Sequence, residues 1–311
     1  MKNVLILSLI LCAVPLRGTT TAENIAKQFF PAALTIIGGL PVPPSQQQVV
    51  FATGALEPGG PTLIVAGYCN SERGSIAVIS AAGTPTMLAS VMPESLVGRH
   101  IAVRLLDLDG DQRLKIVVRV DQYRGLPGTW VYEWSSGELK LLGPTSEETP
   151  GNVASELSDA TFVDLDGDGV MEVIDHQAGA SYDDNGQATV ANEYIVGHVG
   201  NSTFAPQPVD YFGQFVRTKA TPIASDAHFN ATNGDHPRDF ILVNGTGDPK
   251  TRVASATVTL NGSVIVHASD LNEKIERVRL TLPSVATENI LSVELHGQPG
   301  ASVMIVLRPQ P

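Results

Sequence analysis

The stretch "FVDLDGDGVMEVID", residues 162–175, decides how this sequence is expected to fold. It places a run of acidic side chains and two glycines between flanks with the apolar, β-branched character of strands. A near copy, "LLDLDGDQRLKIVV", lies upstream at residues 105–118. Carboxylates this close repel one another unless a cation neutralises them. Each loop therefore needs a counter-charge, and the pair of loops indicates an internal repeat.

The repeat extends beyond the two acidic loops. Two strands about a Ser-Gly turn follow the first loop in "TWVYEWSSGELKLLGP", and "NEYIVGHVGNSTFAP" stands similarly after the second. A degenerate earlier unit without an acidic loop fits residues 62–90. Four strands in each unit predict propeller blades. Residues 35–217 hold only about three or four blades, so the propeller is small and incomplete, is completed by other chains, or is another open assembly.

The composition favours an all-β fold. Hydrophobic residues make up 43% of the 311 residues and charged residues 17%, as in folded proteins. Aromatic residues are sparse at 5%, whereas Gly (29) and Pro (21) are plentiful. This mixture is typical of short strands joined by tight turns. Beyond one short helix over residues 22–34, no stretch keeps a helical period for long.

The domain boundaries are expected where the residue composition and pattern change along the chain. Residues 1–22 have the pattern of a secretory signal, with Lys2, a short apolar core and small residues up to Ala22. An exported protein is therefore expected, whether secreted, periplasmic or at the cell surface. A propeller-like repeat domain is predicted over 23–217. A β-sandwich is predicted over 218–311, where "TVTLNGSVIV" carries an Asn-Gly hairpin signal.

The charge excludes several classes of partner. With a net charge of −12, the chain is expected to avoid nucleic acid and anionic membranes and to attract divalent cations. No stretch after the signal is long and apolar enough to span a membrane. Only Cys69 remains after the signal, so no internal disulfide is expected. A metal ion is then a candidate for stabilising the exported chain.

The second acidic loop predicts a calcium site. Calcium takes six to eight oxygen ligands in flexible geometry, whereas magnesium demands a stricter octahedron and zinc prefers Cys and His. Four acids are expected to supply the side-chain ligands: Asp164, Asp166, Asp168 and Glu172. The backbone carbonyl of Val170 is expected to supply a further ligand. A β-hairpin is favoured over an EF-hand because both flanks have strand character. Ordinary Asx-rich turns without an ion are the alternative.

The first loop departs from this pattern. Asp107, Asp109 and Asp111 match the first three acids, and Arg113 stands where Val170 does. Gln112 replaces the glycine of the sharp turn, and Lys115 replaces the last acid. A lysine removes one ligand and adds a competing charge. Weak calcium binding, or none, is therefore predicted for the first loop.

The segment "DLDGDGVMEVI" resembles the calcium loop of FG-GAP/VCBS repeats, the blades of integrin-α-type propellers. The resemblance covers residues 45–215 and implies a propeller, bound calcium and a binding or adhesion role. The resemblance implies the same calcium ligands in this chain, namely Asp164, Asp166, Asp168, Glu172 and the Val170 carbonyl. The segments "RVASATVTLNG" and "NILSVELHGQPGASVMIVL" are similar to a β-sandwich module at the ends of bacterial exported proteins.

No catalytic pattern stands out. The sequence has no H-E-x-x-H, G-x-S-x-G, P-loop or dinucleotide fingerprint. Trp130, Tyr132 and Trp134 alternate along one strand, so they share a face. Buried packing is expected for them, with stacking on sugar rings as the alternative.

Three functions are compatible with the sequence, of which the first is favoured; because no catalytic pattern is visible, the chain is predicted not to be an enzyme. The first is a non-catalytic, calcium-binding adhesion protein that contacts an extracellular glycan or protein ligand. The second is a polysaccharide-active enzyme, a lyase or hydrolase, or the accessory subunit of one. The third is a structural protein that self-associates through its unpaired strand edges.

Overall fold

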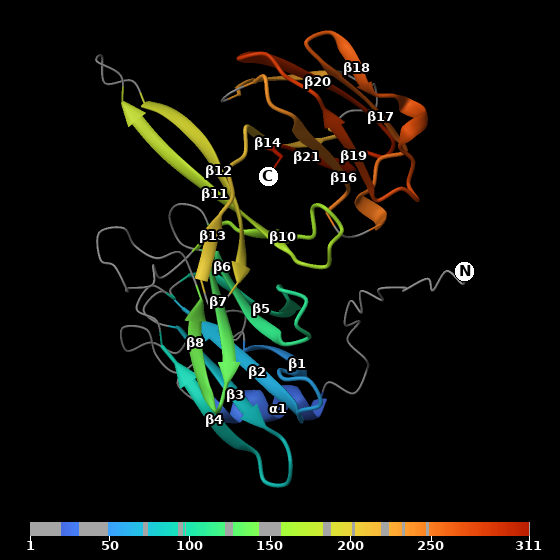
Figure 1. Cartoon of the computed structure of the whole chain (residues 1–311). Coiled ribbons are helices and arrows are strands. Elements are labelled where there is room, and N and C mark those ends of the chain that lie inside the picture. The colour runs from blue at the N-terminus through green and yellow to red at the C-terminus, as the bar shows by residue number, and fades with distance from the viewer. Residues whose placement is uncertain are drawn as a thin grey trace, which may run out of the picture. The chain divides into compact units, whose positions relative to one another are not determined.

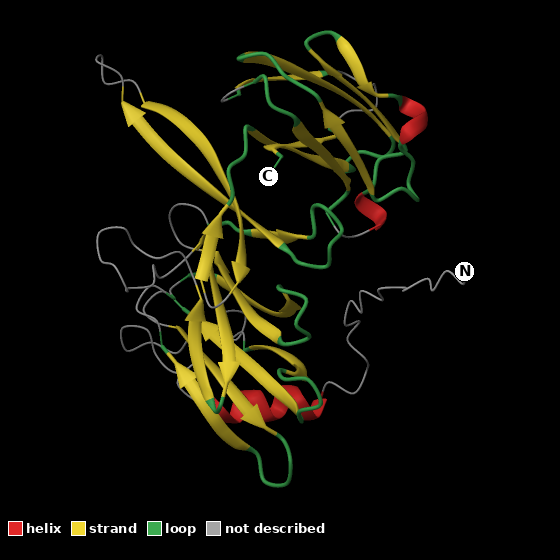
Figure 2. Cartoon of the chain, viewed as in Figure 1, coloured by secondary structure: helices red, strands yellow, loops and turns green. Residues whose placement is uncertain are grey.

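The computed structural model describes residues 20–30, 49–70, 74–92, 96, 98–121, 127–142, 157–182, 188–200, 203–218, 224–231, 234–246 and 249–310. These residues form an all-β fold, as predicted, in which strands greatly outnumber helices (Figure 2). The helical elements are α1 (Thr20–Phe29) and two short 3-10 helices, η3 (Pro249–Thr251) and η4 (Ala268–Asp270). The predicted signal lies outside the described residues, apart from 20–22 at the start of α1. Within the described part of the chain, no helix has the length and apolar character to cross a membrane.

The chain divides into two compact units. Unit 1 comprises Met1–Leu106, Leu114–Pro127 and Tyr132–Lys140. Unit 2 comprises Asp107–Arg113, Gly128–Val131 and Leu141–Pro311.

Three sheets have their four main strands in chain order, as blades of a propeller do (Figure 1). The first contains β1 (Val50–Ala55), β2 (Thr62–Cys69), β3 (Gly74–Ser80) and β4 (Thr86–Val91). The second contains β5 (His100–Asp107), β6 (Leu114–Asp121), β7 (Gly128–Ser135) and β8 (Glu138–Leu142), with β9 (Leu157–Ser158) on β7. The third contains β10 (Thr161–Val163), β11 (Glu172–Tyr182), β12 (Ala188–Gly200) and β13 (Thr203–Pro206). The acidic loops join β5 to β6 and β10 to β11, so the predicted repeat unit of four strands is confirmed.

The first sheet is buried on the face that α1 covers. Ile25, Ala26 and Phe30 of the helix region pack with Ile64 of β2 and Ile79 of β3. Both strands are apolar along most of their length and buried almost throughout. A continuous apolar run of this kind is typical of a strand covered on both faces.

A β-sandwich follows, made of two four-stranded sheets in unit 2. One sheet has the order β14-β21-β16-β19, from β14 (Tyr211–Val216), β21 (Ser302–Pro309), β16 (Arg238–Asn244) and β19 (Arg277–Leu282). The other has the order β15-β20-β17-β18, from β15 (Ser225–Asn230), β20 (Glu288–His296), β17 (Ser255–Leu260) and β18 (Ser263–Val266). The sandwich therefore already includes β14, which precedes residue 218.

The two sheets of the sandwich differ in what covers their outer faces. In β20, buried residues alternate with exposed or half-buried ones, so one face enters the sandwich core. In β16, every residue is buried. Phe240 and Leu242 face the sandwich core. Ile241 and Val243 pack on the other side, in a second core that includes Leu165 at the start of the acidic loop. This packing holds the β10–β11 loop against the sandwich.

Candidate functional site

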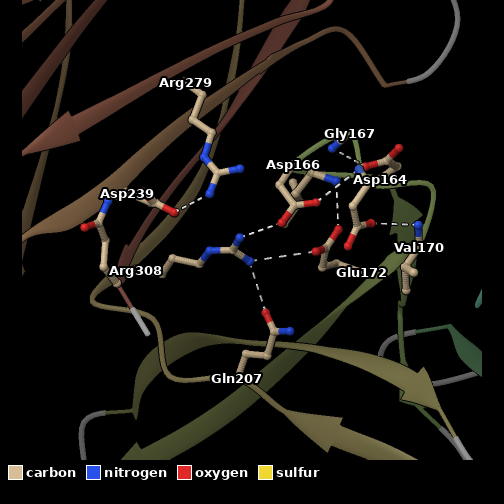
Figure 3. Close-up of polar contacts among 12 residues, drawn as sticks. Asp164, Asp166, Gly167, Val170, Glu172, Gln207, Asp239, Arg279 and Arg308 are labelled. Atoms are coloured by element: carbon tan, nitrogen blue, oxygen red, sulfur yellow. Dashed lines mark hydrogen bonds and ion pairs between the residues drawn. The ribbon is translucent and has the colours of Figure 1, made fainter.

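The acidic loop between β10 and β11, taken together with Glu172 as residues 164–172 and here called loop 2, gathers three carboxylates (Figure 3). One oxygen each from Asp164, Asp166 and Glu172 lies within 4.8 Å of the others. Asp164 follows β10 directly and Glu172 opens β11, so the hairpin brings the two ends of the loop together. Three carboxylates at this spacing form a strongly negative group.

Loop 2 is shaped by hydrogen bonds from backbone N–H groups to aspartates. Asp164 accepts from the N–H of Gly167 at 2.5 Å and from that of Gly169 at 3.3 Å. Asp168 accepts from Val170 N at 2.8 Å, and its residue is exposed. These are Asx turns, which tighten a loop without any ion. Asp168 is therefore engaged in the turn and is not part of the three-carboxylate group.

Two arginines of the sandwich reach the carboxylates of loop 2. Arg308 of β21 donates from Nη2 to Asp166 Oδ2 at 2.6 Å, and its Nη1 lies 3.8 Å from Glu172 Oε1. Arg277 of β19 donates to the backbone carbonyl of Asp164 at 2.5 Å, and the same Nη2 lies 3.5 Å from Asp164 Oδ1. Figure 3 shows the Arg308 guanidinium directed at Asp166 and Glu172. Each member of the group thus has a cationic neighbour.

Burial and charge move the pKa values of this group in opposite directions. Burial raises the pKa of Glu172 to about 7, with the Asp166 carboxylate also raising it, against a hydrogen bond from Leu165 N and the charge of Arg308. Burial acts to raise the pKa of Asp166 as well. There the hydrogen bond and charge of Arg308 outweigh burial, and the pKa falls below its ordinary value. Protonation of Glu172 would reduce the repulsion within the group.

The donor set of loop 2 fits calcium in chemical type. Its three carboxylates supply the oxygen ligands that Ca²⁺ prefers. The predicted side-chain set is brought together only in part, because Asp168 lies outside the three-carboxylate group. A bound ion would also share these carboxylates with Arg277 and Arg308. Calcium at loop 2 stays a prediction.

The first acidic loop, residues 107–113 and here called loop 1, has the same turn with different partners. One oxygen each from Asp107, Asp109 and Asp111 lies within 4.8 Å of the others. Gln112 donates its N–H to Asp107 Oδ2 at 3.0 Å and has φ of 67°, the left-handed region in which Gly169 of loop 2 lies. Arg113 donates its N–H to Asp111 at 2.8 Å, and its exposed Nε lies 3.9 Å from the same carboxylate.

Lys115, which replaces the last acid of the motif, is almost fully buried in β6. Its Nζ lies 3.5 Å from Glu133 Oε1 in β7. The lysine is therefore part of an ion pair between strands of the second sheet. The two acidic loops also touch, because Met171 donates its N–H to the Leu108 carbonyl at 2.8 Å.

A second candidate site lies on the sandwich, where the structure contains a cleft of about 400 Å³. Its lining comes from β15, from the β17–β18 turn and from the start of β20: His228, Phe229, Asn230, Asn261, Glu288, Asn289 and Ile290. None of these residues was predicted as a site from the sequence. The signals that were present are the Asn-Gly turn at Asn261 and the alternation of polar and apolar residues in β20.

Hydrogen bonds hold the lining of this cleft in place. Asn261 donates from Nδ2 to Asn289 Oδ1 at 2.9 Å and accepts from the N–H of Ile290 at 2.8 Å. Asn289 is buried and donates to the Ala286 carbonyl at 2.7 Å. These contacts connect the β17–β18 turn to β20. The cleft is therefore built on strands and on a braced turn.

The aromatic stripe of β7 is part of the core. Trp130, Tyr132 and Trp134 are all buried, which confirms the packing that was predicted for them. Burial raises the pKa of the Tyr132 hydroxyl well above its ordinary range. These rings are not exposed for stacking on a sugar.

Comparisons with known proteins give a limited result. No protein-family model matches the chain, and no curated protein does. The solved structures similar to it include a fructofuranosidase from Schwanniomyces occidentalis, at 10% identity and a TM-score of 0.27 over 88% of this chain and 73% of that one. An exo-inulinase from Aspergillus awamori has 11% identity and a TM-score of 0.27 over 87% and 69%. An exo-β-1,3-galactanase from Phanerochaete chrysosporium has 10% identity and a TM-score of 0.20 over 83% and 67%.

These comparisons correct part of the sequence analysis. The assignment to FG-GAP/VCBS repeats is wrong, since no family model matches and the structures found are glycan-cleaving enzymes. The non-catalytic adhesion role and the prediction that the chain is not an enzyme, which was made because no catalytic pattern is visible in the sequence, are corrected by the same finding. At these TM-scores the enzymes assign no substrate and no residue role to this chain.

Proposed function

We propose that this protein is an exported, polysaccharide-active protein, either an enzyme or the accessory subunit of one, and that it holds glycan in the sandwich cleft. The observation that carries the proposal is the cleft itself, with its polar and apolar groups on a braced framework. The predicted signal over residues 1–22 supports export.

The chemistry of the cleft suits a sugar. Sugar hydroxyls both donate and accept hydrogen bonds, and a lining with an amide, an imidazole and a carboxylate can pair with both roles. Asn230, His228 and Glu288 supply these groups from exposed positions. Ile290, which is 47% exposed, supplies an apolar surface for the C–H face of a pyranose ring.

The experiment is a screen of the purified protein against a panel of polysaccharides, measuring both depletion of protein from solution and release of soluble product. Binding to at least one glycan is expected, and it should be lost in the His228→Ala/Asn230→Ala double variant. Thr257→Ala is the control, because Thr257 lies in the same sheet outside the cleft. Product release assigns an enzyme, and binding alone assigns an accessory subunit. Neither binding nor product across the panel would contradict the proposal.

Calcium belongs to the proposal as a structural ion at loop 2. Its support is the three-carboxylate group that joins β10 to β11, Asp164, Asp166 and Glu172. In this position the ion would stabilise the hairpin and its packing on the sandwich. It would not contact the glycan, because the cleft is lined by β15, β20 and the β17–β18 turn.

A further inference from the structure

The two sheets of the sandwich carry opposite kinds of charge. The sheet β14-β21-β16-β19 contains four arginines: Arg238, Arg277, Arg279 and Arg308. The sheet β15-β20-β17-β18, which forms the cleft, contains no lysine and no arginine in its strands. Its acidic residues are Asp226, Glu288 and Glu294.

The arginines of the first sheet face acids of the protein. Arg238 pairs with Asp210, and Arg279 donates to Asp239 at 2.6 Å. Arg308 and Arg277 contact loop 2, as described above. All four arginines of the first sheet are therefore engaged in ion pairs within unit 2.

The acids of the cleft sheet lie on its outer face. In β20, Asn289, Leu291 and Val293 are buried, so the residues between them point away from the core. Glu288 is one of these, and it is directly opposite Asn230 in the register of β15 with β20. Both line the cleft, and both are exposed. The carboxylate of Glu288 is thus available to a ligand.

The charge of the lining selects among glycans. Among the described residues that line the cleft, the titratable side chains are those of Glu288 and His228, and none is a lysine or arginine that would pair with a uronate or sulfate group. A glycan with anionic groups would meet Glu288 without compensation and inside a chain of net charge −12. A protonated amino group would instead pair with that carboxylate.

We infer that the cleft takes amino sugars in preference to neutral sugars and rejects uronates and sulfated sugars, with Glu288 as the residue that sets this order. The inference rests on the proposed function, because it presumes that the cleft binds glycan. The preference for a free amine over its N-acetylated form is expected to be about two- to fivefold, since an exposed ion pair is screened by solvent. Added salt is expected to reduce it further.

The test uses an array of oligosaccharides matched in length, with amino-sugar, neutral, uronate and sulfated members, probed at neutral pH with the full chain. Affinity for the best-bound backbone is then measured in solution with its free-amine and N-acetylated forms. Glu288→Gln is expected to remove the preference for the amine, so that the ratio of the two affinities falls to about one. Glu294→Gln is the matched control, because Glu294 is in the same strand and on the same face but does not line the cleft.

The outcomes separate the two levels of the proposal. Binding led by uronate or sulfated members, or an amine preference that survives Glu288→Gln, would overturn the charge selectivity and leave the proposed function standing. An equal loss of preference in Glu294→Gln would show that net charge, and not the cleft, is responsible, and would also overturn it. Absence of binding to every member would contradict the proposed function itself.

Discussion

Loop 1 and loop 2 have the same Asp-x-Asp-Gly-Asp frame, but they differ in how their charge is balanced. In loop 2, Arg277 and Arg308 reach the carboxylates from the sandwich, across more than a hundred residues of sequence. In loop 1, an exposed ion pair joins Arg113 to Asp111, two residues away. A shared sequence motif therefore determines the shape of the turn but not which cationic side chains balance the charge of its carboxylates.

The conformational strain of the two loops differs as well. Gly169 takes φ of 90° in loop 2, where a residue without Cβ fits freely. The equivalent Gln112 takes φ of 67° in loop 1, which costs about 1 kcal/mol for a residue with a side chain. Loop 1 thus keeps its turn at a conformational cost that loop 2 avoids.

The largest effect is expected from the arginine that spans two carboxylates of loop 2. Arg308→Gln leaves Asp166 and Glu172, which are 14% and 5% exposed, without their cation. The free energy of unfolding should fall by about 3 kcal/mol, because breaking a largely buried ion pair leaves its partner unpaired. Urea denaturation would measure the loss. Arg113→Gln in loop 1 is the control, with an expected change of about 0.5 kcal/mol for an exposed pair; equal losses would mean that burial does not separate the loops.

Calcium provides the second test of the comparison. If loop 2 binds Ca²⁺ as proposed, saturation at about a hundred times the dissociation constant should raise the stability by about 2.7 kcal/mol. Asp164→Asn should abolish most of this gain, and Asp107→Asn in loop 1 should leave most of it. Thermal melting with calcium and with chelator would measure both. No calorimetric heat together with an unchanged melting curve would reject the calcium proposal.

A third test asks how far the charge network of loop 2 extends into the sandwich. Burial acts to raise the pKa of Asp239, but hydrogen bonds from Gln310 and Arg279 and the charge of Arg279 outweigh it and lower the pKa. A carboxyl with a lowered folded-state pKa adds stability above its unfolded-state pKa, and this stability is lost as pH falls through the folded-state value. Asp239→Asn should cost about 1–2 kcal/mol at neutral pH. Its cost should shrink in acid; a pH-independent cost would show that packing, and not charge, is lost.

The smallest effects are expected from exchanging the turn residues. Gln112→Gly should stabilise loop 1 by about 0.5 kcal/mol, because relief of the left-handed conformation exceeds the added freedom of the unfolded chain. Gly169→Ala should destabilise loop 2 by about 1 kcal/mol for the opposite reason. Nothing lies within 4 Å of a Cβ built at Gly169, so this substitution tests the backbone alone. Effects of the same sign in both loops would contradict the strain argument.

Several features of the fold followed from local patterns. The four-strand unit around each acidic loop was predicted because turn residues and apolar runs are close in sequence. The sandwich was predicted from its Asn-Gly turn and alternating strands, and the structure confirms both. The buried stripe of Trp130, Tyr132 and Trp134 was predicted for the same local reason.

Other features were missed because they depend on distant residues. The three-carboxylate group does not include Asp168. The Asp168 carboxylate accepts a hydrogen bond from the N–H of Val170 within the turn. The cleft joins Asn230 to Glu288 through strand pairing, which no spacing in the sequence indicates. The resemblance of the acidic loop to a known repeat was followed too far, because a short turn motif can recur without the family.

The amino-acid sequence by itself determined the all-β class, the two acidic turns and the strands that flank them, since these depend on side-chain alternation and on residues that tolerate tight turns. Only the tertiary structure decided which cations face loop 2 and which polar groups meet in the cleft. Both depend on contacts between strands far apart in the chain, and the energy of such contacts comes from burial and charge that exist only once the sheets have packed.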